Sequence, residues 1–138
     1  MIVLDTNVVS ALMNDPPDEQ VVDWLNRQPE SSIWVSSVTI LEIEFGLQVM
    51  PAGKRRTGLA ERFERVLQEM DRRIAVFDDE AARATASLMA SWQKKGRPRD
   101  LRDSMIAGVV LALHASLATR NVAHFSDIPA TVVNPWSS

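Results

Sequence analysis

Short apolar runs alternate along this chain with longer segments in which apolar residues recur every three or four positions. The short runs have the length of buried strands, and the longer segments have the spacing of amphipathic helices. The predicted strands are residues 2–4, 33–35, 74–76, 117–119 and 131–133. This alternation predicts an α/β fold with a mostly parallel central sheet of four to five strands.

Five longer segments carry the apolar spacing of helices. They lie at or around residues 21–25, 38–45, 59–70, 81–95 and 105–113. Gly96 directly follows the fourth segment, in the position where glycine commonly ends a helix. The fifth segment is the most apolar, so we expect a central helix there that includes His114.

Length and composition fit one globular domain spanning residues 1–138. A chain of 138 residues can bury roughly two thirds of its unfolded surface around one core. Its 46% apolar and 24% charged residues show no signature of disorder. Because cysteine is absent, disulfides and thiolate metal sites are excluded, and we expect a cytoplasmic protein. Neither a signal peptide nor a membrane span of about 20 apolar residues is predicted.

Charge is distributed unevenly along the chain. The net charge is −3, but residues 1–53 hold eight acidic residues against one basic residue, whereas residues 54–138 hold ten against fourteen. A local basic surface that binds a nucleic acid is therefore compatible with the negative net charge. The alternative, which we weight equally, is that these basic residues simply form solvent-exposed helix faces. The candidate basic groups are Lys54, Arg55, Arg56, Arg62, Arg65, Arg72 and Arg73, and Lys94, Lys95, Arg97, Arg99 and Arg102.

Four polar side chains are predicted to meet at one edge of the sheet. Asp5 directly follows the first strand, and Glu42 lies in the opening turns of the helix after the second. Asp103 lies near the start of the last long helix, and Asn121 follows the strand that ends at Thr119. In an open α/β sheet, ligands bind outside the carboxyl ends of the strands. We therefore expect these four residues along one rim.

Each acidic residue also has a simpler explanation as a helix cap. Asp5 fits the start of the next helix, Thr39 and Glu42 have the spacing of a capping box, and Asp100 fits the start of the helix that carries Asp103. Considered singly, capping is the favoured interpretation, since acidic residues suit helix starts. Considered together, three carboxylates at one site would repel one another, and a hard divalent cation would relieve that repulsion. Such a site suits the hydrolysis of phosphodiesters.

Other chemistries fit the sequence poorly. Zinc prefers histidine and cysteine, and the chain has only His114 and His124. No G-x-S-x-G motif is present for a serine nucleophile, and the five glycines are too scattered for a phosphate cradle. Phosphatases that use an aspartyl phosphate of the haloacid-dehalogenase type show D-x-D after the strand, whereas this chain has D-T-N.

Five short motifs follow one another along the chain, namely "MIVLDTNVVS", "SSVTILEIEFGL", "RDSMIAG", "LATRNVAHF" and "VNPW". In this order they resemble the PIN domain, and within it the VapC and FitB-like toxins of bacterial type II toxin-antitoxin systems. The resemblance spans nearly the whole chain. It implies a three-layer α/β/α domain that acts as a magnesium-dependent endoribonuclease, with Mn²⁺ as the alternative ion.

The resemblance also implies roles for individual residues. Asp5, Glu42 and Asp103 match the three main acidic residues, so we expect them to be catalytic and to hold the metal. Asn121 occupies the position where many relatives carry a fourth aspartate, which makes it an auxiliary catalytic residue without a charge. A second metal ion should therefore bind more weakly here, unless Asp100 or a substrate phosphate makes up the deficit.

Basic and hydroxyl residues beside these positions are candidates for supporting roles. Thr6 and Asn7 are expected to orient the carboxylates or simply to form the turn after the strand. Arg99, Arg102 and Arg120 are expected to hold RNA phosphates, or to pair with the acidic residues when no substrate is bound.

The expected partners follow from the resemblance as well. They are an RNA substrate, a cognate antitoxin and a second copy of the chain in a homodimer. Trp24, Leu25, Leu47 and part of residues 59–70 are candidates for an apolar groove that receives the antitoxin, with core packing as the alternative. Two other functions remain open, namely a catalytically weak module that binds RNA or antitoxin, and a nuclease or phosphatase that acts on DNA or small phosphomonoesters.

Overall fold

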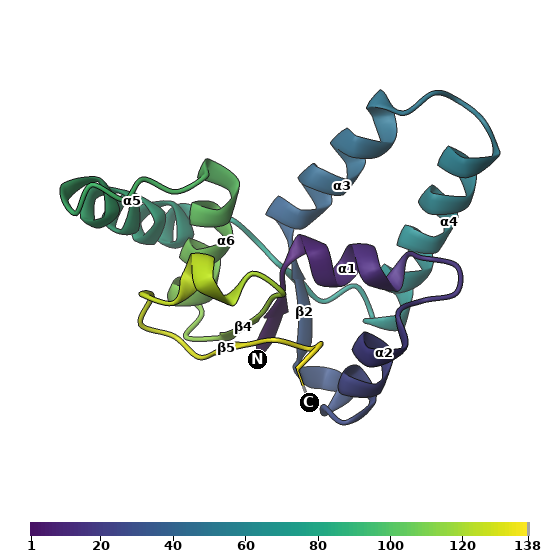
Figure 1. Ribbon diagram of the computed structural model, residues 1–138, viewed down its shortest axis with the longest axis horizontal. Helices are drawn as coiled ribbons and strands as arrows, with labels where there is room; N and C mark the ends of the chain where they lie inside the picture. Colours follow the sequence, from purple (N-terminus) through teal and green to yellow (C-terminus); the bar gives the residue numbers. More distant parts are fainter. Residues whose placement is uncertain (138) are drawn as a thin grey trace.

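A five-stranded sheet forms the centre of the computed structural model, which describes residues 1–137 (Figure 1). The strand order is β3-β2-β1-β4-β5, and every neighbouring pair is parallel. The strands are β1 (Ile2–Leu4), β2 (Ile33–Ser36), β3 (Ile74–Ala75), β4 (Ser116–Ala118) and β5 (Val132–Val133). The predicted α/β class, strand number and parallel arrangement are confirmed, and each predicted strand overlaps an observed one.

Helices cover both faces of this sheet and complete the three-layer α/β/α architecture. They are α1 (Thr6–Leu12), α2 (Glu19–Asn26), α3 (Ser37–Val49), α4 (Lys54–Glu69), α5 (Asp79–Lys94) and α6 (Leu101–Ala112). In Figure 1, α1 to α4 lie on one side of the sheet, and α5 and α6 lie on the other. No helix within residues 1–137 is both long and apolar enough to cross a membrane.

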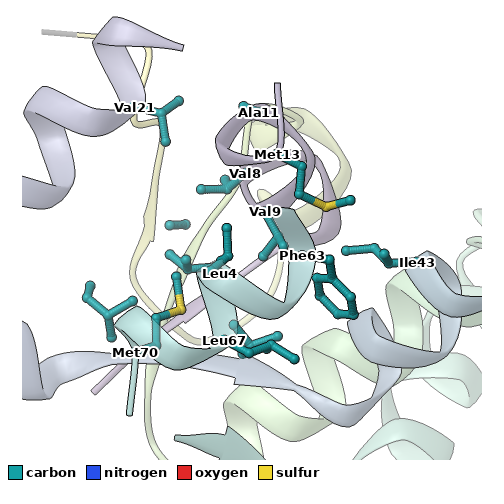
Figure 2. Close-up of a cluster of buried hydrophobic side chains, with 14 of the residues drawn as sticks. Leu4, Val8, Val9, Ala11, Met13, Val21, Ile43, Phe63, Leu67 and Met70 are labelled. Carbon is teal, nitrogen blue, oxygen red and sulfur yellow. The ribbon is translucent and has the colours of Figure 1, made fainter. Parts of the chain in front are cut away.

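The alternation of side chains along the strands divides the core into two clusters. Leu4 and Ala118 belong to the cluster beneath α1 to α4, whereas their neighbours Val3 and Leu117 belong to the cluster beneath α5 and α6. Figure 2 shows the first cluster, in which Phe63 and other apolar residues of α4 lie near Leu4. Successive strand residues point to opposite faces, so a buried central strand needs apolar residues at every position.

One local prediction differs from the structure, and one helix has no counterpart in the apolar pattern. His114 lies outside the predicted central helix, because α6 ends at Ala112 and Leu113 caps it. His114 is exposed and has a left-handed backbone with φ of 51°, and the N–H of Ala115 donates to the carbonyl of Val110. This turn closes the helix and redirects the chain into β4. In addition, the apolar pattern does not predict α1, which has only seven residues.

Gly108 allows α5 and α6 to pack closely. A Cβ at this position would lie 1.9 Å from Thr85 Oγ1 and 2.7 Å from the carbonyl oxygen of Ala81. The Thr85 hydroxyl already donates to that carbonyl at 2.7 Å, so it is held against α5. A side chain at position 108 therefore has no space unless the two helices separate.

Replacing Gly108 with alanine should destabilise the fold by at least about 1 to 3 kcal/mol, the usual cost of overpacking a core. Gly46→Ala is the matched control, because a Cβ there meets nothing within 4 Å. The control should be neutral or should stabilise the helix by about 0.5 to 1 kcal/mol. Urea denaturation of both variants measures the difference, and equal stabilities would contradict this account of the helix contact.

Candidate functional site

Asp5 is a buried carboxylate at the carboxyl end of the central strand β1. Its backbone N–H donates to the carbonyl of Ala118 at 2.8 Å, which aligns this end with β4. Only 4% of the residue is exposed. The side chain accepts hydrogen bonds from the Thr6 N–H at 2.8 Å, the Thr119 hydroxyl at 2.7 Å and the Asn7 amide at 3.3 Å. Asp5 thus caps α1, as the simpler explanation proposed, and also faces the pocket described below.

Glu42 lies on α3 and is oriented by a chain of hydroxyl groups. The N-cap of α3 is Ser36, so the predicted capping box of Thr39 and Glu42 is wrong. Thr39 is buried inside the helix, where its Oγ1 lies 3.0 Å from Thr6 Oγ1, and the Ser36 hydroxyl donates to Thr39 at 3.4 Å. The Thr6 hydroxyl in turn donates to Glu42 Oε1 at 3.1 Å. The last hydroxyl of this series, that of Thr6, thus donates a hydrogen bond to the Glu42 carboxylate and orients it.

Asp103 lies in the first turn of α6, and Asp100 caps that helix. The Asp100 carboxylate accepts hydrogen bonds from the N–H groups of Arg102 at 2.9 Å and Asp103 at 3.3 Å. Capping therefore accounts for Asp100 and leaves the Asp103 carboxylate available to the pocket. His124 Nδ1 lies 3.5 Å from Asp103 Oδ2, which supplies a positive neighbour when the imidazole is protonated.

Asn121 follows β4 and is exposed at the rim. Its backbone N–H donates to Thr119 Oγ1 at 3.0 Å, the same hydroxyl that donates to Asp5. Thr119 therefore connects the auxiliary position to the central carboxylate. From the sequence, Thr119 is predicted only as a strand end, although a hydroxyl at the carboxyl end of the strand beside β1 is a usable signal for a site residue.

All four predicted site residues line one pocket of about 500 Å³. The full lining is Asp5, Thr6, Asn7, Ser10, Ala11, Asn14, Asp18, Glu42, Asp103, Arg120, Asn121 and Trp136. No group of three or more His, Cys, Asp or Glu side chains within residues 1–137 is arranged closely enough to hold a metal ion directly. The acidic residues therefore share a pocket without forming a ready-made ligand cage.

The electrostatics of the pocket favour a bound cation. Burial raises the pKa of the Asp5 carboxyl, the hydrogen bonds from Thr119 and Thr6 offset part of this effect, and the charge of Asp103 adds to it. Burial likewise raises the pKa values of Glu42 and Asp103, and nearby carboxylates add to both. A hard divalent cation fits these oxygen donors, because it would relieve their repulsion and accept a few carboxylates together with water.

The three arginines beside the site have different surroundings. Arg102 Nη1 lies 3.9 Å from Glu42 Oε2, so it is placed to pair with an acidic residue of the pocket. Arg99 instead lies 3.8 Å from Asp127 and donates to the carbonyl of His124. Arg120 lines the pocket itself. Of these three arginines, Arg102 is the one placed to pair with an acidic residue of the pocket, and phosphate binding stays a prediction.

The predicted apolar groove is mostly core. Trp24, Leu47, Phe63, Val66 and Leu67 are all at least 90% buried. Some residues of the predicted groove do line two hollows on the surface. One includes Leu25 and Met70, and the other includes Leu47 and Leu59.

Comparison with known proteins places the whole chain among nucleases and toxins. The family described as PIN domain matches residues 2–130. The VapC ribonuclease Y4jK of Sinorhizobium fredii is 39% identical over 137 residues, which cover 99% of this chain and 98% of that protein. Toxin FitB of Neisseria gonorrhoeae is 31% identical, with 99% of each chain covered.

Among solved structures, FitAB bound to the IR36 DNA fragment contains a chain that superposes with a TM-score of 0.88 at 31% identity. The match covers 100% of this chain and 97% of the other. The agreement therefore extends over the complete α/β/α architecture and not only over the short motifs.

Thr119→Val should destabilise the protein by about 1.5 to 3 kcal/mol at pH 7, since the Asp5 carboxylate loses a hydrogen bond to its charged form. The folded pKa of Asp5 already lies above its ordinary value of 3.8, and the substitution should raise it further. A raised folded pKa costs no stability at low pH, where Asp5 is protonated in both the folded and the unfolded state. It lowers the free energy of unfolding as the pH rises through the folded pKa. The penalty should therefore shrink near pH 3.8.

Urea denaturation at the two pH values tests this expectation, with Thr57→Val as the control because Thr57 is exposed on α4. The control should cost little at either pH. A Thr119→Val penalty that is independent of pH would show that the bond does not act through the charge of Asp5.

Proposed function

The chain belongs to the PIN domain family, and on that premise we propose that it is the endoribonuclease toxin of a type II toxin-antitoxin system, using a divalent cation held by Asp5, Glu42 and Asp103. The single observation that supports this assignment of residues is the shared pocket, which carries these three carboxylates and Asn121. PIN ribonucleases generally need a divalent metal. We propose Mg²⁺, with Mn²⁺ as the alternative, because the donors are oxygen atoms.

The bound ion would activate a water molecule and offset negative charge on the phosphate. The remaining tasks fall to the protein. Asp5 and Asp103 would be the primary ligands, directly or through water, and the three donors on Asp5 keep its carboxylate oriented. Glu42, held by Thr6, would accept a proton from the attacking water and orient it. Asn121 would be an auxiliary oxygen ligand.

The products follow from the identity of the nucleophile. Because water attacks in place of the neighbouring 2'-hydroxyl, cleavage should leave a 3'-hydroxyl and a 5'-phosphate. We further propose that residues 1–138 act as one domain in the cytoplasm, that a cognate antitoxin binds the chain and silences it, and that two copies form a homodimer. The toxin relative FitB and the solved FitAB complex support the antitoxin as partner.

A second function, a catalytically weak module that binds RNA or antitoxin, is favoured by one specific observation. The fourth position carries Asn121, which has no charge, and the acidic residues do not form a closed ligand group within residues 1–137. Comparing cleavage of single-stranded RNA, DNA and a small phosphomonoester, with Mg²⁺, Mn²⁺ or a chelator, separates this module from the ribonuclease and from other hydrolases.

Asp5→Asn and Asp103→Asn should each reduce RNA cleavage by more than about 100-fold. Losing a residue that only hydrogen-bonds to a metal ligand typically costs up to about 100-fold, and losing a ligand should cost more. Both variants should also lose the rise in melting temperature that Mg²⁺ or Mn²⁺ gives the wild type through linked binding. Glu44→Gln is the control, because Glu44 lies on the same helix as Glu42 but does not line the pocket. Wild-type turnover in either aspartate variant would refute the assignment.

Asn121→Asp should strengthen metal binding, because it adds a fourth carboxylate to the pocket. The metal concentration for half-maximal cleavage should fall about tenfold, equivalent to about 1.4 kcal/mol. Titrating Mn²⁺ in a cleavage assay measures this change. An unchanged or higher metal requirement would show that Asn121 does not contribute to metal binding.

A further inference from the structure

One wall of the pocket is built around Trp136, which follows the carboxyl end of β5. The indole N–H of Trp136 donates to Asp18 Oδ2 at 3.1 Å, and its backbone N–H donates to Asn134 Oδ1 at 2.9 Å. The Gln20 side-chain amide donates to the Trp136 carbonyl at 3.2 Å. Trp136 also packs against the core cluster beneath α1 to α4. These contacts fix the aromatic ring relative to the pocket.

Arg120 lies against this ring. Its guanidinium carbon is 4.8 Å from the centre of the Trp136 ring, within the range of a cation–π contact. A cation–π contact uses no N–H acceptor on the ring, so the N–H groups of the guanidinium stay available to other acceptors. A planar fork of N–H donors held in this way is suited to a phosphate, which can accept two parallel hydrogen bonds.

The backbone of Arg120 is connected to the catalytic end of the pocket. The Arg120 N–H donates to Asn7 Oδ1 at 3.2 Å, while the other end of the same amide donates to Asp5 Oδ2 at 3.3 Å. Asn7 therefore sets Arg120 and Asp5 in a fixed relation. A ligand that contacts both would be positioned by one rigid network.

Arg120 also differs from its neighbours in charge pairing. Arg102 lies near Glu42 and Arg99 near Asp127, whereas no carboxylate within residues 1–137 lies within 4.0 Å of the Arg120 guanidinium nitrogens. Arg120 is the basic residue of the pocket lining, and it is exposed. The pocket thus has an acidic part suited to a cation, and Arg120 presents one cationic fork on another wall. The Asp18 carboxylate lies on that wall too, where the hydrogen bond from the Trp136 indole and, to a smaller extent, the charge of Arg120 lower its pKa.

We propose that Arg120, braced by Trp136, binds an RNA phosphate adjacent to the one that is cut. The inference rests on the proposed function, since it places the same RNA strand across the pocket from the acidic residues to Arg120. The pocket has a volume of about 500 Å³, within the usual range for small-ligand sites, and both Arg120 and the acidic residues line it. Arg120 is thus a substrate-binding residue, and Trp136 is a positioning residue.

Equilibrium binding of a short fluorescent single-stranded RNA of mixed sequence tests the proposal, with Ca²⁺ in place of Mg²⁺ and the RNA checked for integrity. Between about 50 and 200 mM salt, the slope of log affinity against log salt falls by about 0.7 for each phosphate contact that is lost. Arg120→Gln should lose about this much slope. Arg120→Lys should keep the slope and bind more weakly, because it retains the charge but not the fork.

Arg83→Gln is the matched control, since Arg83 is exposed on α5 and does not line the pocket. It should keep both slope and affinity. Trp136→Phe should weaken RNA binding and keep the slope, because it preserves an aromatic face but loses the bond to Asp18. In cleavage assays, Arg120→Gln should raise KM more than it lowers kcat.

An Arg120→Gln protein with the wild-type salt slope would overturn the proposal. A wild-type protein that binds no RNA would overturn it together with the proposed function. If the slope change is found but the wild type cleaves no RNA with any metal, the proposed catalysis fails alone and Arg120 remains an RNA-binding residue.

Discussion

The burial of the Asp5 carboxylate at the end of the central strand determines how the polar residues around it are arranged. An ionised side chain that is only 4% exposed costs several kcal/mol unless it is paired or hydrogen-bonded. The fold meets that cost for Asp5 with donors from two places, the turn into α1 and the end of β4. Two of these donors also accept hydrogen bonds from the residues that follow Thr119. The Thr119 hydroxyl accepts from the Asn121 N–H, and the Asn7 side chain accepts from the Arg120 N–H. Hydrogen bonds thus connect the position of Asp5 to those of Asn121 and Arg120.

The donors on Asp5 do not fully offset its burial, since its pKa still lies above the ordinary value. Glu42 and Asp103 share this condition, and their basic neighbours, Arg102 beside Glu42 and His124 beside Asp103, do not cancel the effect of burial. A site of this kind is less stable than an apolar one of the same shape, and natural proteins retain such groups mainly where function needs them. A divalent cation would supply the missing positive charge, which links the cost of the site to its proposed chemistry.

The sequence was informative wherever a local pattern determines the outcome. Continuous apolar runs predicted the strands, and the rule that ligands bind outside the carboxyl ends of parallel strands predicted that Asp5, Glu42, Asp103 and Asn121 share a pocket. Capping was harder to predict, because several polar residues precede α3 and only the backbone decides that Ser36 is the cap. The contact of Arg120 with Trp136 joins positions distant in the chain, so it depends on the complete fold and no local pattern could predict it. The extent of α6 was overestimated for the same reason, because the left-handed turn at His114 is set by the path into β4.

Anomalous diffraction from crystals of this protein grown with Mn²⁺ would show directly whether Asp5 and Asp103 hold the ion. We expect a peak in the pocket between Asp5 and Asp103, bound to their carboxylates directly or through one water molecule, with Glu42 on the same side. Mn²⁺ peaks only at other carboxylates, or no peak in this pocket at a saturating Mn²⁺ concentration, would contradict the assignment of Asp5 and Asp103 as metal ligands.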